Sequence, residues 1–180
     1  MMNSKKRLRS LMVLPLAGLM VACGSAAGDE ESSATVSEQV LRLTATSDIP
    51  SMDITAATDL VSFTAMNNAF EGLYTLDLDG KAIPASAADM PEISEDGLVY
   101  TFTIRDDAVW SNGDPVTSSD YVYAWQKMVD STVAAGYAYM YDGLIQNATE
   151  IIAGELDPAE LAVEAISDKE LQVTLVQPAP

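Results

Sequence analysis

The clearest structural signal in the sequence is the stretch Asp96-Gly97-Leu98-Val99-Tyr100-Thr101-Phe102-Thr103-Ile104-Arg105. Every second residue from Leu98 to Ile104 is apolar, and the residues between them are mostly threonine, which is the pattern of a strand that buries one face. The Asp-Gly pair at the start is a strong turn signal. The stretch therefore predicts a β-strand that follows a tight turn.

Weaker signals of the same kind predict further strands on both sides of this stretch. The pair Asp79-Gly80 and the pair Asp168-Lys169 mark turns beside apolar runs that favour extended structure. The spacing Asp77-x-Asp79-Gly80 is similar to a calcium loop, but it lacks the acidic residue that such a loop needs at its twelfth position, so a hairpin turn is the better interpretation. The predicted strands are 41–45, 74–76, 163–166 and 171–176.

Three segments have the apolar spacing of helices. A helix is predicted at 58–72 with Gly72 as its C-terminal cap, and another at 144–153 that ends at Gly154. Thr117 and Asp120 form a capping pair at the start of a third, which runs to Val129. The apolar residues of the first helix are Leu60, Phe63, Met66, Phe70 and Leu73, and the expected buried face of the third is Tyr121, Val122, Ala124, Trp125, Met128 and Val129. Together the elements predict an α+β domain with several antiparallel strand pairs.

The N-terminus has the pattern of an export signal. Four basic residues between Lys5 and Arg9 precede an uncharged run from Leu11 to Ala22. This run is too short for a transmembrane helix, which needs about 20 apolar residues. Residues 1–22 are therefore predicted to be a signal peptide.

Cys23 is the only cysteine of the chain, so it has no partner for a disulfide. The sequence Met20-Val21-Ala22-Cys23 resembles the lipobox of bacterial lipoproteins, in which the cysteine receives a diacylglyceryl group and becomes the first residue. Cys23 is therefore predicted to be a lipid attachment site. Residues 23–38 are rich in small and acidic residues and predict a flexible tether between the membrane and a folded body at 39–180.

Charge excludes two classes of partner. Four of the nine basic residues precede Cys23, so removal of the signal leaves five basic and 27 acidic residues and a net charge of −22. Such a chain is repelled by phosphate backbones, so we expect no nucleic-acid binding. It is also repelled by anionic lipid head groups, so adhesion to a membrane has to come from the acyl chains.

The composition also argues against catalysis. The chain has no histidine and only one cysteine, which excludes a histidine-based triad, a Cys-His dyad and a thiolate zinc cluster. No cofactor or metal is expected, although the many carboxylates leave a carboxylate pair or a calcium site open. Tyr137, Tyr139 and Tyr141 alternate and could line one side of an extended stretch. They fit either core packing or a ligand cleft.

Several segments together carry a family resemblance. They are residues 43–53, residues 70–80, the stretch 96–105, the run Trp110-Ser-Asn-Gly-Asp-Pro-Val-Thr117 and the run Asp120-Tyr-Val-Tyr-Ala-Trp125. In this order and spacing, they resemble the oligopeptide-binding proteins of ABC importers, the extracellular solute-binding proteins of family 5. The resemblance covers nearly everything from Leu41 to Pro180.

The resemblance implies a partial periplasmic-binding-protein-like fold (type II, cluster C). Residues 39–180 would supply the first strand of one lobe and a small subdomain of antiparallel sheet and helices, and the second lobe would be absent. The chain would then be the N-terminal fragment of a longer product or a truncated relative. Trp110 and Trp125 are expected in the core.

The resemblance also implies a function. The protein would capture oligopeptides outside the cell and deliver them to the permease subunits of an ABC transporter, from a lipid anchor on the outer face of the cell membrane, or in the periplasm of a two-membraned cell. The residues Ser47, Asp48, Ile49 and Pro50 would border the ligand cleft, and Tyr139 would face the ligand. Alternatives are capture of peptide pheromones, or a truncated surface lipoprotein that acts as an interaction or adhesion module.

Overall fold

The structure is a computed structural model that describes residues 40–179. The chain divides into two units, Met1–Arg42 and Leu43–Pro180, and the second contains all the helices and strands described below. The predicted signal peptide, Cys23 and the predicted tether therefore lie outside the described residues. No helix within 40–179 is long and apolar enough to cross a membrane.

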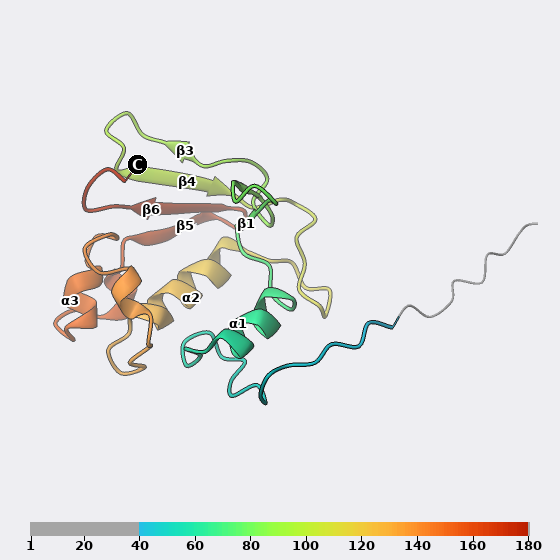
Figure 1. Ribbon diagram of the computed structural model, residues 1–180. Helices are drawn as coiled ribbons and strands as arrows, with labels where there is room; N and C mark the ends of the chain where they lie inside the picture. Colours follow the sequence, from blue (N-terminus) through green and yellow to red (C-terminus); the bar gives the residue numbers. More distant parts are fainter. Residues whose placement is uncertain (1–39, 180) are drawn as a thin grey trace, which may run out of the picture. The chain divides into compact units, whose positions relative to one another are not determined.

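A four-stranded antiparallel sheet forms the upper layer of this unit in Figure 1, with the helices below it. Its strand order is β3 (Glu92–Ile93), β4 (Val99–Thr103), β6 (Glu170–Thr174) and β5 (Val163–Ser167). Phe102 of β4 lies opposite Leu171 of β6. The turn before β4 is confirmed, since Gly97 has a positive φ of 73° and its N–H donates to the Ser94 carbonyl at 2.8 Å. The sequence predicted β4, β5 and β6 but not the two-residue strand β3.

Helix α2 (Ser118–Val129) lies along the sheet (Figure 1). The predicted capping pair is confirmed, because the Asp120 carboxylate accepts hydrogen bonds from the backbone N–H of Thr117 at 2.7 Å and from its hydroxyl at 3.0 Å. Met128 and Val129 are buried as expected. Ala124 is exposed, so its place on the buried face was wrong: it lies on the solvent side, next to the exposed Tyr123.

The start of α2 is fastened to the turn between β5 and β6. The Ser118 hydroxyl is fully buried and donates to the Ser167 carbonyl, while the Ser118 N–H donates to the Asp168 carbonyl at 2.9 Å. On the same turn, the Lys169 ammonium group donates to the Val116 carbonyl at 2.8 Å. These bonds satisfy polar groups that burial would otherwise leave without water or partner.

A short helix and a two-stranded hairpin precede the sheet in the chain. Helix α1 (Leu60–Asn67) is shorter than the predicted 58–72. It ends early because the Asn68 side chain donates to the Thr64 carbonyl at 2.7 Å and so competes with further helical bonding. The strands β1 (Tyr74–Leu76) and β2 (Ala82–Pro84) form the expected hairpin around Gly80.

Shorter elements complete the chain between α2 and β5. They are the 3₁₀ helix η1 (Ala138–Met140), helix α3 (Ala148–Ile152) and the 3₁₀ helix η2 (Pro158–Glu160). Helix α3 covers only the second half of the predicted 144–153, because Asn147 has a left-handed backbone with φ 70° that cannot belong to an α-helix. Gly154, with φ 76°, ends it as predicted.

Two other expectations were wrong. Residues 41–45 form no strand, and Leu41 and Leu43 are 81% and 79% exposed. A strand requires a neighbour that accepts its backbone hydrogen bonds, and within the described residues no such bond reaches this segment. Trp110 is 47% exposed instead of buried, because it lies on the loop before α2.

Candidate functional site

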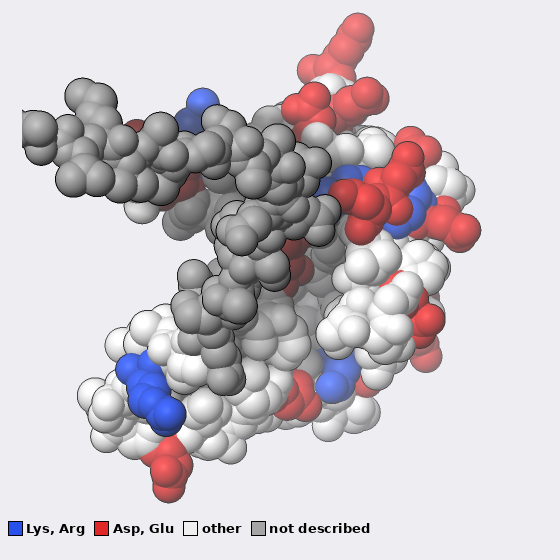
Figure 2. Space-filling model, turned by 90° about the vertical axis from the view of Figure 1, so that its right-hand side faces the viewer, with Lys and Arg blue, Asp and Glu red and all other residues white. Residues whose placement is uncertain are grey.

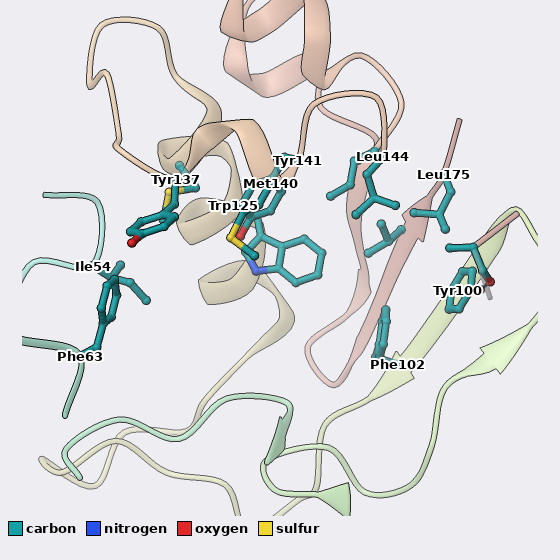
Figure 3. A pocket seen from close by; sticks show the side chains of 14 residues that line it. Ile54, Phe63, Tyr100, Phe102, Trp125, Tyr137, Met140, Tyr141, Leu144 and Leu175 are labelled. Atoms are coloured by element: carbon teal, nitrogen blue, oxygen red, sulfur yellow. Dashed lines mark hydrogen bonds between the residues drawn. The ribbon is translucent and has the colours of Figure 1, made fainter. Parts of the chain in front are cut away.

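An apolar pocket of about 700 Å³ lies between the sheet, α2 and η1, and we take it as the candidate site. No charged residue lines it. The sheet contributes Tyr100 and Phe102 from β4, Val173 from β6, and Leu175, which follows β6 (Figure 3). These side chains face the same way because alternate residues of a strand point to one face of the sheet.

Aromatic and methionine side chains form the second wall. Trp125 comes from α2, and Tyr137, Met140 and Tyr141 come from η1 and its two flanking residues. The rings of Trp125 and Tyr141 pack edge to face with their centroids 6.1 Å apart. Burial raises the pKa of the Tyr141 phenol, so it stays uncharged.

A third wall comes from the segment around α1. Ile54 and Phe63 lie beside Tyr137 at one end of the pocket in Figure 3. The rings of Phe63 and Tyr137 meet edge to face at 5.5 Å. The pocket is therefore bounded by parts of the chain more than 100 residues apart, and at its sheet end Ala179 completes the lining. There the Tyr100 hydroxyl donates to the Ala179 carbonyl at 3.0 Å.

Asp53 connects the third wall, which is the N-terminal wall of the pocket formed by Ile54 and Phe63, to helix α2. Its carboxylate accepts the Thr55 N–H at 2.9 Å and the Thr55 hydroxyl at 2.7 Å, and it pairs with Lys127 of α2 at 3.4 Å. The hydrogen bonds from Thr55, together with Lys127, lower the pKa of Asp53. A second tie joins this wall to α1, since the Ser51 N–H donates to the buried Ser62 hydroxyl at 3.3 Å.

The residues expected to bind a ligand lie close along the chain to this pocket but do not line it. Ser47, Asp48, Ile49 and Pro50 are exposed and form no regular structure. They precede Ile54, which does line the pocket. Tyr139 is 65% exposed and does not line the pocket, although its ring lies 5.8 Å from that of Tyr137. Their role in binding stays a prediction.

Sequence reasoning missed most of the pocket. The alternation of the three tyrosines suggested that they could line one side of an extended stretch, but η1 brings Tyr137 and Tyr141 into the pocket lining and leaves Tyr139 outside it. The spacing of four residues was the available signal, since such pairs share a helical face. The contributions of Ile54 and Leu144 had no local signal, because they arise only when distant segments meet.

The charged side chains of the described residues lie outside the lining of the apolar pocket. Residues 40–179 contain 23 acidic and five basic side chains, and acidic groups predominate on the face in Figure 2. A more polar hollow of about 770 Å³ lies beside β1, and Glu71 on its wall pairs with Arg105 at 2.9 Å. Within the described part of the chain, no cluster of acidic or cysteine side chains could hold a metal ion.

Comparisons with known proteins agree on one family. Residues 81–180 match the bacterial extracellular solute-binding proteins, family 5, in their middle part. A dipeptide-binding protein of Lactococcus lactis is 37% identical over 93% of this chain and 29% of its own length. Listeria monocytogenes OppA bound to peptide is 50% identical with a TM-score of 0.75, over 79% of this chain and 28% of that one. The pheromone receptor PrgZ is 41% identical with a TM-score of 0.74, over 77% and 27%. The chain thus spans less than a third of these relatives.

Proposed function

We propose that this chain, which belongs to family 5 of the bacterial extracellular solute-binding proteins, helps to capture oligopeptides outside the cell and deliver them to a membrane permease. The observation that carries the proposal is the 50% identity and TM-score of 0.75 with an OppA bound to peptide. The likeness supports a partial periplasmic-binding-protein-like fold and favours capture over an adhesion module. The family is one of binding proteins, and without histidine we expect no catalysis.

The segment Ser47–Pro50 suits recognition of a peptide backbone. It is exposed, and among the described residues its one hydrogen bond is local, from the Ser47 hydroxyl to the Asp48 carbonyl at 3.3 Å. Its other backbone groups can therefore pair with an extended peptide, as in the addition of a strand, which binds without reading side chains. The acidic surface attracts the positive N-terminus of a peptide.

The length of the chain sets what it can do alone. Because it spans 29% of the Lactococcus relative, we expect most of a closed cleft to come from sequence that it does not contain. The 180-residue chain should therefore bind peptides weakly or not at all.

The test compares two proteins by calorimetric titration with a mixture of short peptides. One is this chain without its predicted signal peptide, and the other is a chimera in which the remaining sequence of Listeria OppA follows Pro180. We expect heat of binding only with the chimera. Absence of heat with a folded chimera at any concentration would contradict peptide capture, and tight binding by the 180-residue chain would contradict the need for a second part of the cleft.

A pair of variants tests the contribution of this chain to the chimera. Ile49→Asp places a charge at the proposed cleft border and should weaken peptide binding. Leu78→Asp, at the fully exposed tip of the β1–β2 hairpin, should leave binding unchanged. Equal effects of the two changes would remove Ser47–Pro50 from the site.

Sensing of a peptide pheromone is a second candidate, favoured by the likeness to PrgZ. A nutrient importer should bind many peptides with similar affinity, because it recognises the backbone. A receptor should prefer one peptide strongly over a random mixture. Competition between a labelled peptide and defined peptides, measured on the chimera, separates the two.

Lipid anchoring at Cys23 explains how such a protein stays beside its permease. The lipobox-like run Met20–Cys23 supports it, and the two acyl chains of a diacylglyceryl group hold a protein firmly at a membrane, where one chain would bind only marginally. Cys23→Ala should release the protein from the membrane fraction, whereas Ser25→Ala should not. Retention of Cys23→Ala in that fraction would show that the anchor is not at this residue.

A further inference from the structure

We propose that Gly136 is a positioning residue of the candidate peptide site. Because it has no side chain, the tyrosine loop (130–141), which carries Tyr139, can pack directly on the N-terminal segment (47–63), which begins with Ser47–Pro50. The proposal rests on the proposed function, in which both regions contact the ligand. It assigns the spacing between them to one place where no side chain fits.

The two segments approach each other too closely at Gly136 for a side chain. A β-carbon at this position would lie 2.7 Å from the Cγ2 methyl carbon of Thr58, whereas packed carbon atoms are about 3.5–4.0 Å apart. Thr58 is β-branched, so its χ1 angle is restricted and the methyl group cannot turn away freely. Gly136 is not among the glycines with a positive φ. Glycine is therefore required here for space and not for backbone conformation.

Two further contacts hold the same parts of the chain together on either side of Gly136. The rings of Phe63 and Tyr137 meet edge to face with their centroids 5.5 Å apart, at one end of the view in Figure 3. The Asp53 carboxylate pairs with the Lys127 ammonium group at 3.4 Å. The N-terminal segment therefore meets α2 and the tyrosine loop along three contacts. Of these, the one at Gly136 depends on the absence of a side chain.

The N-terminal side of the contact is closely connected to Ser47–Pro50. The Ser51 N–H donates to the buried Ser62 hydroxyl at 3.3 Å, so the chain is fixed directly after the proposed cleft border. Ala57, next to Thr58, is buried as well. A displacement of Thr58 is therefore passed on to the base of the proposed cleft border.

The loop side of the contact is connected to Tyr139 over a similarly short distance along the chain. Tyr139 lies three residues after Gly136 in η1, where the Met140 N–H donates to the Tyr137 carbonyl at 3.0 Å. Ala135, directly before Gly136, is buried. A displacement at Gly136 therefore reaches Tyr139 within one helical turn. Together the two connections make this contact the point that sets how far Tyr139 stands from the cleft border.

The first test measures the spacing between the two regions directly. Nitroxide labels are attached to Met52→Cys and Tyr139→Cys, both at exposed positions, in the chimera with Listeria OppA sequence after Pro180. Cys23→Ser removes the only cysteine that this chain contributes. Pulsed electron paramagnetic resonance should give one narrow distribution of distances, and Gly136→Ala should make it longer or broader. An unchanged distribution would overturn the proposal.

Calorimetric titration of the unlabelled chimera with short peptides gives the second readout. Gly136→Ala should raise the dissociation constant about tenfold, the effect of a modest packing strain, while circular dichroism shows the same folded spectrum. A folded variant that binds as tightly as the parent chimera would overturn the proposal. If the parent chimera itself binds no peptide, the proposed function fails, and the distance measurement still decides whether Gly136 sets the spacing.

Two matched variants separate the spacing from general damage to the fold. Thr58→Ala removes the methyl group that would meet the added β-carbon, so the double variant Thr58→Ala/Gly136→Ala should recover the distances and the affinity of the parent. Gly72→Ala is the control, because its β-carbon would lie 3.4 Å from the Tyr74 carbonyl oxygen, an ordinary contact, and it should change neither. A double variant as impaired as Gly136→Ala, or a control impaired to the same degree, would overturn the proposal.

Discussion

The two halves of the four-stranded sheet differ although they share the same strands. In the closed half, Ile104, Leu171 and Val163 are at most 3% exposed and belong to one core with Val129 of α2. In the open half, Tyr100, Phe102 and Leu175 continue β4 and β6 but border the pocket. The alternation of side chains is the same in both halves. Whether a side chain of the sheet is buried therefore depends on which element packs against that face of the sheet, and not on the pattern of the strand itself.

The largest effect on stability is expected when a leucine of the closed half is replaced by alanine, and the same substitution in the open half provides the comparison. Leu171→Ala leaves a cavity in a fully buried site and should lower the free energy of unfolding by about 2–5 kcal/mol. Leu175 directly follows β6 and lines the pocket. Leu175→Ala should therefore lower the free energy of unfolding clearly less than Leu171→Ala, because the side chain is already next to open space. Urea unfolding followed by circular dichroism measures both. Equal losses would show that the open half is as tightly packed as the closed one.

The closed half could be predicted because its signals are local. Alternation identified β4 and β6, and the pair of Thr117 and Asp120 located the start of α2 within a residue. The turn before β4 followed from Asp96-Gly97, because only glycine adopts the required positive φ without strain. Each of these features depends on residues a few positions apart in the chain.

The open half and the N-terminal segment could not be predicted in this way. Residues 41–45 alternate as well as β4 does, but alternation does not supply a partner, and in the structure this segment pairs with nothing described. The pocket requires Ile54, Trp125 and Leu175 to meet, and no pattern in the sequence relates these positions. The alternation of Tyr137, Tyr139 and Tyr141 is typical of an extended stretch, so it did not predict the 3₁₀ helix η1.

The next effect concerns the fastening of α2 to the closed half. Ser118→Ala removes the buried hydroxyl that donates to the Ser167 carbonyl and should lower the free energy of unfolding by about 0.5–1.5 kcal/mol, the net contribution of one hydrogen bond. Ser119→Ala is the control, since Ser119 is exposed on the same turn of the helix and should change stability little. Thermal or urea unfolding of both variants measures the difference. A Ser118→Ala protein as stable as the control would mean that water replaces the lost bond.

A smaller effect is expected at the cap of the same helix. Thr117→Ala removes the hydroxyl bond to Asp120 but keeps the backbone N–H bond, so it should cost about 0.5–1 kcal/mol. The loss should appear in global unfolding, measured with urea and circular dichroism. A Thr117→Ala protein as stable as wild type would show that the Thr117 N–H bond to Asp120 caps the helix sufficiently by itself.

The smallest effect is the pH dependence that Asp53 gives to the open half. Its pKa in the folded protein is lowered from the ordinary value of 3.8, first by the Thr55 hydroxyl and N–H and then by Lys127. The stabilisation is therefore complete above pH 3.8 and is lost as the pH falls through the lower folded value.

Asp53→Asn should remove this dependence, since an amide cannot ionise. The difference in unfolding free energy between wild type and Asp53→Asn should be constant at neutral pH and should shrink on acidification, and added salt should reduce it because the group is exposed. Thr55→Val is the matched change, because it removes the strongest cause of the pKa shift without altering charge, and it should move the transition toward pH 3.8. A pH profile of Asp53→Asn parallel to that of wild type throughout the acid range would show that Asp53 does not hold the N-terminal wall of the pocket to α2.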